Sequence, residues 1–141
     1  MIGAGRGTLH QIIFSSRAAR CLSSDDIWLL CDRSWQRNAA EQVTGLFLCD
    51  GARFLCALEG ERKVVENTFA RIMSDGRHFG VDILSRRDVR HREFDRSPMS
   101  CLLFQDHAGV ANVLDSVKSS VANLTDIKSR AYFIGFAKFL R

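Results

Sequence analysis

The sequence predicts an α+β domain whose core is a ferredoxin-like sheet, with the element order βαββαββ and two further helices at the C-terminal end. Short apolar segments rich in β-branched and aromatic residues alternate with two amphipathic segments of helical spacing. Asp50-Gly51 joins two neighbouring strands, and this dipeptide is a strong hairpin signal because both central positions favour positive φ. Right-handed crossovers then place the two intervening helices on one face of the sheet.

The first strand and helix are predicted within residues 9–38. Residues 9–15 form an apolar, β-branched run that is typical of a buried strand. Ser23 and Asp26 resemble a capping box and predict the start of a helix that continues to about Asn38. Its apolar stripe consists of Ile27, Leu30, Cys31 and Ser34.

The remaining elements follow the same reasoning. Strands are expected at 43–49 and 53–58, a second amphipathic helix at 64–73, and further strands at 79–85 and 99–104. Gly76 is expected to end the second helix as its C′ residue. Helices around 110–117 and 127–139 either cover the second face of the sheet or bind a partner.

Composition narrows the function classes. The chain has 141 residues and a net charge of +4, and no apolar run approaches the roughly 18 residues that cross a membrane. These features favour a cytoplasmic globular protein. Its five cysteines are odd in number and include no CxxC pair, which argues against a disulfide framework or a zinc site. Arginines cluster over 86–96 without a nucleic-acid-binding motif, so we expect a solvated edge strand and loop rather than a nucleic-acid site.

No catalytic constellation is present in the sequence. The four histidines are scattered, and metalloprotease, nucleophile-elbow and P-loop motifs are absent. Asp25-Asp26 is explained by helix capping. A small hydrolase of the same fold, such as an acylphosphatase, is disfavoured because no Arg and Asn pair lies on a phosphate-cradling loop. We therefore expect neither an enzyme nor a metal site.

Seven segments, in order and at matching spacing, resemble the BLUF family of flavin-based blue-light sensors. The resemblance covers about 9–99. Its pieces are LHQIIFSSRA at 9–18, Leu22-Ser23, Asn38 six residues before Thr44-Gly45-Leu46, Phe54-Leu55, Leu58-Glu59-Gly60, Arg71-Ile72 followed by Asp75, Arg77 and His78, and finally Arg92, Phe94 and Met99. It implies a BLUF-like domain at 9–104. The residues themselves predict a flexible lead at 1–8 and a C-terminal helical extension at 105–141 that packs on the sheet or on a partner.

The resemblance also implies a cofactor and its ligands. In the family, FAD lies between the two helices that pack on the sheet, and an Asn and an Arg-His pair contact it. The matching residues here are Asn38, Arg77 and His78. A flavin edge presents acceptors and an N–H donor, which suit amide, guanidinium and imidazole groups. The alternative is that Asn38 is a helix C-cap and that Arg77-His78 is a solvated turn.

The sequence departs from the family at the photochemical positions. The family's light switch uses a Tyr on the first strand and a Gln on the third, which correspond to Phe14 and Cys56. Phe has no O–H group, and Cys is a short, weak hydrogen-bond partner. The family's Trp just before Met99 corresponds to Ser97. A flavin adduct at Cys56 is disfavoured against a core-filling role, since apolar residues surround this thiol and no base is adjacent.

Two function hypotheses follow from the resemblance. The first is an FAD-binding sensory or regulatory protein that acts through protein–protein contact and has lost ordinary BLUF photochemistry. The second is a cofactor-free BLUF-like interaction module, either an adaptor or a homodimer, which predicts an occluded cleft between the helices. Both imply a protein partner or a homo-oligomer, with no nucleic-acid or membrane partner.

Overall fold

The computed structural model describes residues 8–94, 100–103 and 110–138, and the side chains of 8–94 and 114–138. Most of the expected lead at 1–8 therefore lies outside the described residues. The elements confirm the predicted order. They are β1 (Leu9–Ala18), α1 (Ser24–Glu41), β2 (Thr44–Cys49), β3 (Arg53–Gly60), α2 (Arg62–Met73), β4 (His78–Val89), β5 (Ser100–Leu103), α3 (Val110–Ser120) and α4 (Ile127–Lys138).

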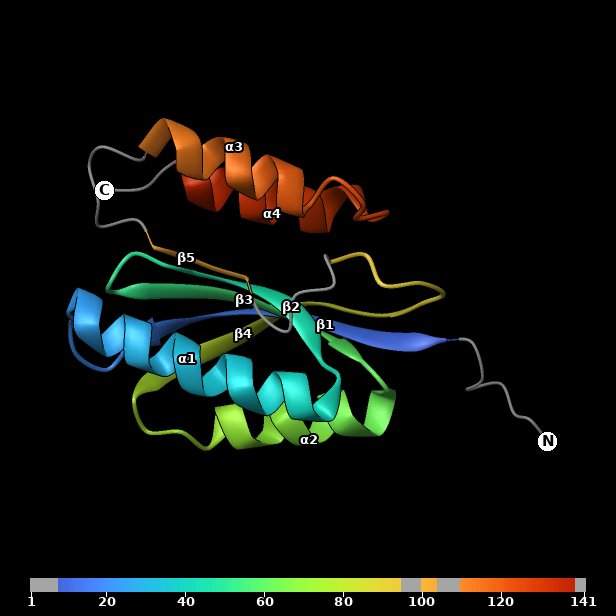
Figure 1. Cartoon of the computed structure of the whole chain (residues 1–141), viewed down its shortest axis with the longest axis horizontal. Helices are drawn as coiled ribbons and strands as arrows, with labels where there is room; N and C mark the ends of the chain where they lie inside the picture. Colours follow the sequence, from blue (N-terminus) through green and yellow to red (C-terminus); the bar gives the residue numbers. More distant parts are fainter. Residues whose placement is uncertain (1–7, 95–99, 104–109, 139–141) are drawn as a thin grey trace.

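The strands form one sheet in the order β4-β1-β3-β2-β5. β1 pairs antiparallel with β3 and β4, and β2 pairs antiparallel with β3, as the ferredoxin-like prediction requires. β5 extends the sheet by pairing parallel to β2. Helices α1 and α2 lie on one face and α3 and α4 on the other, so the molecule has three layers (Figure 1).

The hairpin between β2 and β3 forms where it was predicted, but its turn differs. Within the described chain, Gly51 has a positive φ of 93°, whereas Asp50 does not. The Asp50 carboxylate instead accepts hydrogen bonds from the backbone N–H groups of Ala52 and Arg53 at 3.0 and 2.7 Å. The expectation that Asp50 and Gly51 are the two central residues with positive φ was wrong, because the backbone N–H of Asp50 donates to the carbonyl of Arg53 at 3.3 Å and the central residues are therefore Gly51 and Ala52.

Helix α1 begins with the predicted capping box and ends later than predicted. The backbone N–H of Asp26 donates to Ser23 Oγ at 3.1 Å, and the N–H of Ser23 donates to Asp26 Oδ2 at 3.2 Å. The helix continues to Glu41, where Gln42 caps it in the left-handed conformation with φ 57°. The alternative that Asn38 caps this helix is therefore wrong, since Asn38 lies within its last turn.

The end of α2 also differs from the prediction. Ser74 is the C-cap, and its hydroxyl donates to the carbonyl of Ala70 at 3.1 Å. Gly76 lacks the positive φ that a left-handed C′ residue needs. The assignment of Gly76 as C′ was wrong because the Ser74 hydroxyl and backbone satisfy the last carbonyls of the helix.

Each sheet face has its own apolar core. The residues buried beneath α1 and α2 include Ile12, Phe14, Ile27, Phe47, Phe54, Cys56, Leu58, Val65 and Phe69. Those beneath α3 and α4 include Ile13, Leu46, Leu48, Leu55, Phe94, Val117, Val121, Leu124 and Phe133. This division follows strand alternation, because neighbouring residues such as Ile12 and Ile13 point to opposite faces.

A buried carboxylate ties the end of the sheet together. Glu59 on β3 is 0% exposed. It accepts hydrogen bonds from Gln11 Nε2 at 2.9 Å, Thr44 Oγ1 at 3.0 Å, and the backbone N–H groups of Glu93 and Phe94 at 2.8 and 3.3 Å. These donors compensate for burying the charge and fix the segment after β4 against β1, β2 and β3.

The Glu59 network continues into the arginine cluster and the C-terminal helices. Arg87 lies 3.4 Å from Glu93 Oε1 in an ion pair, and Thr125 Oγ1 donates to Glu93 Oε2 at 2.7 Å. Arg92 donates to Thr44 Oγ1 at 2.8 Å and to the carbonyl of Gln42 at 2.9 Å. β4 is an edge strand, as expected. Arg87 and Arg92, however, are not simply solvated, because they bond to Glu93 and Thr44 of this network.

Two further observations concern the cysteines and the helices. Cys31 on α1 is disulfide-bonded, so the argument against disulfides from the cysteine count was wrong for this residue. Cys21, Cys49 and Cys56 are free. No helix in the described ranges is long and apolar enough to cross a membrane.

Candidate functional site

A cleft of about 770 Å³ lies between α1 and α2 above the middle of the sheet. Its floor contains Phe14 of β1, Cys56 of β3 and Phe47 of β2. Phe14 pairs with Cys56 across β1 and β3, and Cys56 pairs with Phe47 across β3 and β2. The strand register therefore places the Phe14 and Cys56 positions side by side in one cross-strand row.

The floor is apolar, and its one thiol is not ionised. The rings of Phe14 and Phe69 meet edge-on with centroids 5.2 Å apart, which anchors α2 over β1. The Cys56 side chain is 3% exposed, and its sulfur lies 3.8 Å from the carbonyl of Ala57. Burial raises the pKa of this thiol to about 12. Cys56 is therefore a protonated, core-filling thiol, and it offers no thiolate to the cleft.

Asn38 contributes a buried amide to the cleft. It lies in the last turn of α1 and is 3% exposed. Its backbone carbonyl accepts a hydrogen bond from the backbone N–H of Val43 at 2.9 Å. A buried amide carries both donor and acceptor groups. The position predicted from sequence thus lies where a bound molecule would meet the end of α1.

Arg77 lies at the cleft mouth in the turn before β4. Its guanidinium pairs with the carboxylate of Asp75 at 2.5 Å, and its side chain is 57% exposed. The hydrogen bond from Arg77 holds the pKa of Asp75 down at about 2. Arg77 therefore matches the predicted solvated turn in its exposure while still lining the cleft.

His78 lies deeper in the cleft, and both of its ring nitrogens are engaged. Nε2 lies 2.6 Å from the carbonyl of Ile72, so this nitrogen carries a proton and donates. Nδ1 lies 2.8 Å from Ser16 Oγ, and in the neutral ring it accepts from that hydroxyl. His78 thereby ties α2 and β1 together, and its ring lies edge-on to Phe54 with centroids 6.3 Å apart.

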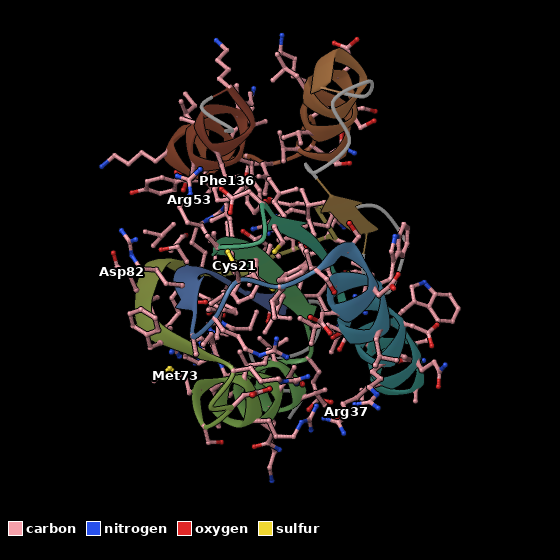
Figure 2. The ribbon with its side chains drawn as sticks, turned by 90° about the vertical axis from the view of Figure 1, so that its left-hand side faces the viewer. Cys21, Arg37, Arg53, Met73, Asp82 and Phe136 are labelled. Carbon is pink, nitrogen blue, oxygen red and sulfur yellow. The ribbon has the colours of Figure 1, made fainter. Side chains whose placement is uncertain are left out.

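The mouth of the cleft is rich in arginine. Arg20, Arg33, Arg37, Arg71 and Arg77 line it, against three acidic residues. Arg71 pairs with Glu41 at 3.1 Å. Figure 2 shows Arg37 between α1 and α2, at the open side of the cleft. The rim therefore carries an excess of positive charge that suits an anionic group.

The sequence analysis did not identify Thr68 as a residue of the cleft. Its assignments of Ser97 and Met99 cannot be compared with the structure. Thr68 of α2 lines the cleft and is 3% exposed. Its place among apolar helical positions gave no signal, because Thr is common in packed helices. Ser97 and Met99 lie outside the described residues. Within the described residues, no group of three His, Cys, Asp or Glu side chains could hold a metal ion.

Comparison with known proteins identifies the architecture. The family model described as "Sensors of blue-light using FAD", BLUF, matches residues 9–100. The chain belongs to the BLUF family. The predicted resemblance to this family is therefore confirmed.

The curated BLUF relatives are much longer proteins. Photoactivated adenylate cyclase subunit beta of Euglena gracilis is 30% identical over 90 residues, which cover 64% of this chain and 10% of that protein. The corresponding subunit of Euglena longa is 28% identical over 90 residues, again 64% of this chain and 10% of the relative. The aligned part of the chain thus spans about a tenth of the length of these relatives.

Solved BLUF structures share the fold. The BLUF domain of BlrP1 has a TM-score of 0.77 at 24% identity, covering 92% of this chain and 90% of that one. A structure of Klebsiella pneumoniae BlrP1 with FMN and cyclic diGMP has a TM-score of 0.64 at 28% identity, covering 75% of this chain and 29% of that one. BlrB in its dark state has a TM-score of 0.67 at 22% identity, covering 86% and 93%.

Proposed function

We propose that this chain is a flavin-binding BLUF protein that regulates through protein contact and has lost the ordinary BLUF light switch. The observation that carries the proposal is the open cleft between α1 and α2, with Phe14 and Cys56 paired at its floor. Family membership and the FMN named for the 28% identical BlrP1 structure support a flavin as its ligand. The ligand proposed here is FAD.

The cleft fits a flavin in size and chemistry. Small-molecule sites commonly measure about 300–1,000 Å³, and the cleft measures about 770 Å³. Its aromatic floor suits a flat ring system. Asn38 at one end and Arg77 at the other supply polar groups that orient the ring, and His78 beside Arg77 would do so by giving up its bond to Ser16 or Ile72. The arginines at the mouth suit the phosphates of FAD.

The proposed loss of the switch follows from two side chains. A bound flavin supplies absorption of blue light. Phe14 has no hydroxyl that could give up a proton, and Cys56 is a buried thiol whose raised pKa keeps it neutral. Neither side chain can form the strong hydrogen bonds that a Tyr and a Gln would make across this cross-strand pair.

A second candidate is a cofactor-free interaction module. Two observations favour it, since His78 already uses both ring nitrogens on Ser16 and Ile72, and Arg77 is held by Asp75. Against it stands the cleft itself, which this hypothesis expects to be occluded. In either case the partner would meet the outer surfaces of the helices, because α3 and α4 already cover the second sheet face.

An absorption spectrum and a thermal melt distinguish the two candidates. The FAD-binding protein is expected to purify with oxidised-flavin absorption, or to acquire it on refolding with excess FAD. Its melting temperature is expected to rise with FAD concentration. A colourless protein that gains neither absorption nor stability from FAD would refute flavin binding and leave the cofactor-free module.

A further inference from the structure

One buried polar atom in the cleft has no partner. Thr68 Oγ1 on α2 is inaccessible, and it finds no hydrogen-bond partner among the described residues. The other two buried side-chain atoms in this condition are His10 Nε2 and Arg130 Nε, and neither residue lines the cleft. Within the described part of the chain, Thr68 is thus the cleft residue with an unused buried polar group.

The usual ways of satisfying this hydroxyl are not used. A helical Thr commonly donates to the carbonyl four residues earlier, here that of Val64, but no such bond is present for Thr68. The neighbouring Phe69 anchors this part of α2 on Phe14 of β1. The cleft is also lined by Phe14, Phe47, Phe54 and Cys56, and the Thr68 hydroxyl bonds to none of them. A buried hydroxyl without a partner lowers stability unless a ligand supplies one.

We infer that the Thr68 hydroxyl is a binding group for the ring system of the flavin. This inference rests on the proposed function and adds a residue to it. A hydroxyl can donate to a ring nitrogen or carbonyl acceptor and can accept from a ring N–H, and the isoalloxazine edge presents all of these. Because Thr68 Oγ1 has less than 1 Å² of accessible surface in the cleft, a rotation of this side chain about its Cα–Cβ bond is part of the inference. Thr68 would then meet the ring from α2, and Asn38 would meet it from α1.

The inference predicts opposite effects of one substitution on the free and the loaded protein. Thr68→Val keeps the shape of the side chain and removes the hydroxyl. In the flavin-free protein it removes an unsatisfied group, so the melting temperature is expected to stay the same or rise. In the loaded protein it removes a hydrogen bond, so FAD is expected to bind about threefold to tenfold more weakly. If the role of Thr68 were purely structural, Thr68→Val would lower both the melting temperature of the flavin-free protein and the affinity for FAD.

Thr68→Ser and riboflavin serve as controls. Thr68→Ser retains the hydroxyl and is expected to bind FAD within about twofold of the unmodified chain. Riboflavin has the same ring and no phosphate, so Thr68→Val is expected to weaken riboflavin and FAD by the same factor. Titration of each flavin into flavin-free protein, followed by fluorescence quenching, measures these affinities.

Three outcomes would overturn the inference. If the unmodified chain binds FAD and Thr68→Val binds it equally well, a water molecule satisfies the hydroxyl, and only this inference fails. If Thr68→Ser loses affinity for FAD and Thr68→Val does not, the contact is made by the methyl group, which Val retains and Ser lacks. If the unmodified chain binds neither flavin, the proposed function fails, and the Thr68 contact fails with it.

Discussion

At the scale of single residues, the proposed loss of the light switch depends on the cross-strand pair of Phe14 and Cys56. The register places them directly opposite each other on β1 and β3. A hydroxyl at the first position and an amide at the second would therefore be within reach of each other and of a ligand above them. We therefore propose that Phe14 and Cys56, which lack those groups, leave the scaffold without hydrogen bonds to rearrange there.

Restoring both groups is expected to restore the switch. In FAD-loaded protein, blue light is expected to produce no red shift of flavin absorption in the unmodified chain. Phe14→Tyr with Cys56→Gln is expected to recover a small red shift, because the pair then holds both a proton donor and a rotatable amide. Each single substitution supplies one group and serves as the matched control. Light–dark difference spectra measure the effect, and a red shift in the unmodified chain would contradict the argument.

Thiol reactivity provides a second prediction at this scale. Burial raises the pKa of Cys56 to about 12 and that of Cys49 to about 11, whereas Cys21 is exposed. At pH 8 only about one Cys56 thiol in ten thousand would be ionised, even before burial limits access. Iodoacetamide is therefore expected to label Cys21 in native protein and to spare Cys49 and Cys56.

Mass spectrometry of the labelled peptides tests this expectation. Unfolding in denaturant should make all three thiols reactive. A Cys21→Ser variant should show almost no labelling at these three positions while folded. Rapid labelling of Cys56 in native protein would mean that its thiol is ionised or exposed. That result would contradict the core-filling role and would favour a contact between this thiol and the flavin.

At the scale of elements, the sequence predicted which segments form helices and strands, and it failed at their ends. The strand and helix patterns and the Ser23 capping box were sufficient for the order of elements. Helix α1 continues past Asn38 and is capped by Gln42 in the left-handed conformation. The sequence did not predict this end, because a left-handed cap is usually a glycine. Gly76 was misread because the Ser74 side chain, not a glycine, satisfies the end of α2.

The site was predictable only where the family motif reaches. Asn38, Arg77 and His78 line the cleft, as do Phe14 and Cys56, and their contact with a flavin stays a prediction. Glu59, Gln11 and Glu93 gave no signal as a network, because their contacts join residues up to 82 positions apart. Periodicity reports which face a side chain takes, but it does not report which distant polar groups meet.

The Glu59 network predicts a large effect from a single-atom change. Glu59→Gln replaces a carboxylate oxygen, which accepts from buried donors, by an NH₂ group that faces them. We expect unfolding free energy to fall by roughly 2–4 kcal/mol, because at least one buried N–H or O–H loses its acceptor.

Glu66→Gln is the matched control for Glu59→Gln. Glu66 is 42% exposed and pairs with Arg62 and Arg86 at 3.8 and 3.6 Å, so its substitution should cost less than about 1 kcal/mol. Urea unfolding of the two variants measures the difference. Equal, small losses would show that the Glu59 carboxylate is not held as described.

At the scale of the whole molecule, the cleft and the C-terminal helices lie on opposite faces of one sheet. Two physical links cross between them. The Glu59 network extends from the end of α1, through Arg92 and Glu93, to Thr125 between α3 and α4. Arg53 of β3 lies over the ring of Phe136 of α4 with 4.9 Å to the ring centroid (Figure 2). A ligand that shifts α1 or β3 therefore has contacts through which α3 and α4 can respond.

This arrangement requires α4 to be an integral part of the fold, and two neighbouring aromatics test it. Phe133 is 0% exposed and meets Phe94 edge-on with ring centroids 5.9 Å apart, whereas Tyr132 on the same helix is 40% exposed. Phe133→Ala is expected to lower unfolding free energy by about 3–5 kcal/mol, since it opens a cavity in the second core. Tyr132→Ala should cost less than about 1 kcal/mol. If urea unfolding gives equal, small losses for both variants, then α4 does not pack on the sheet, and the second face would be free for a partner.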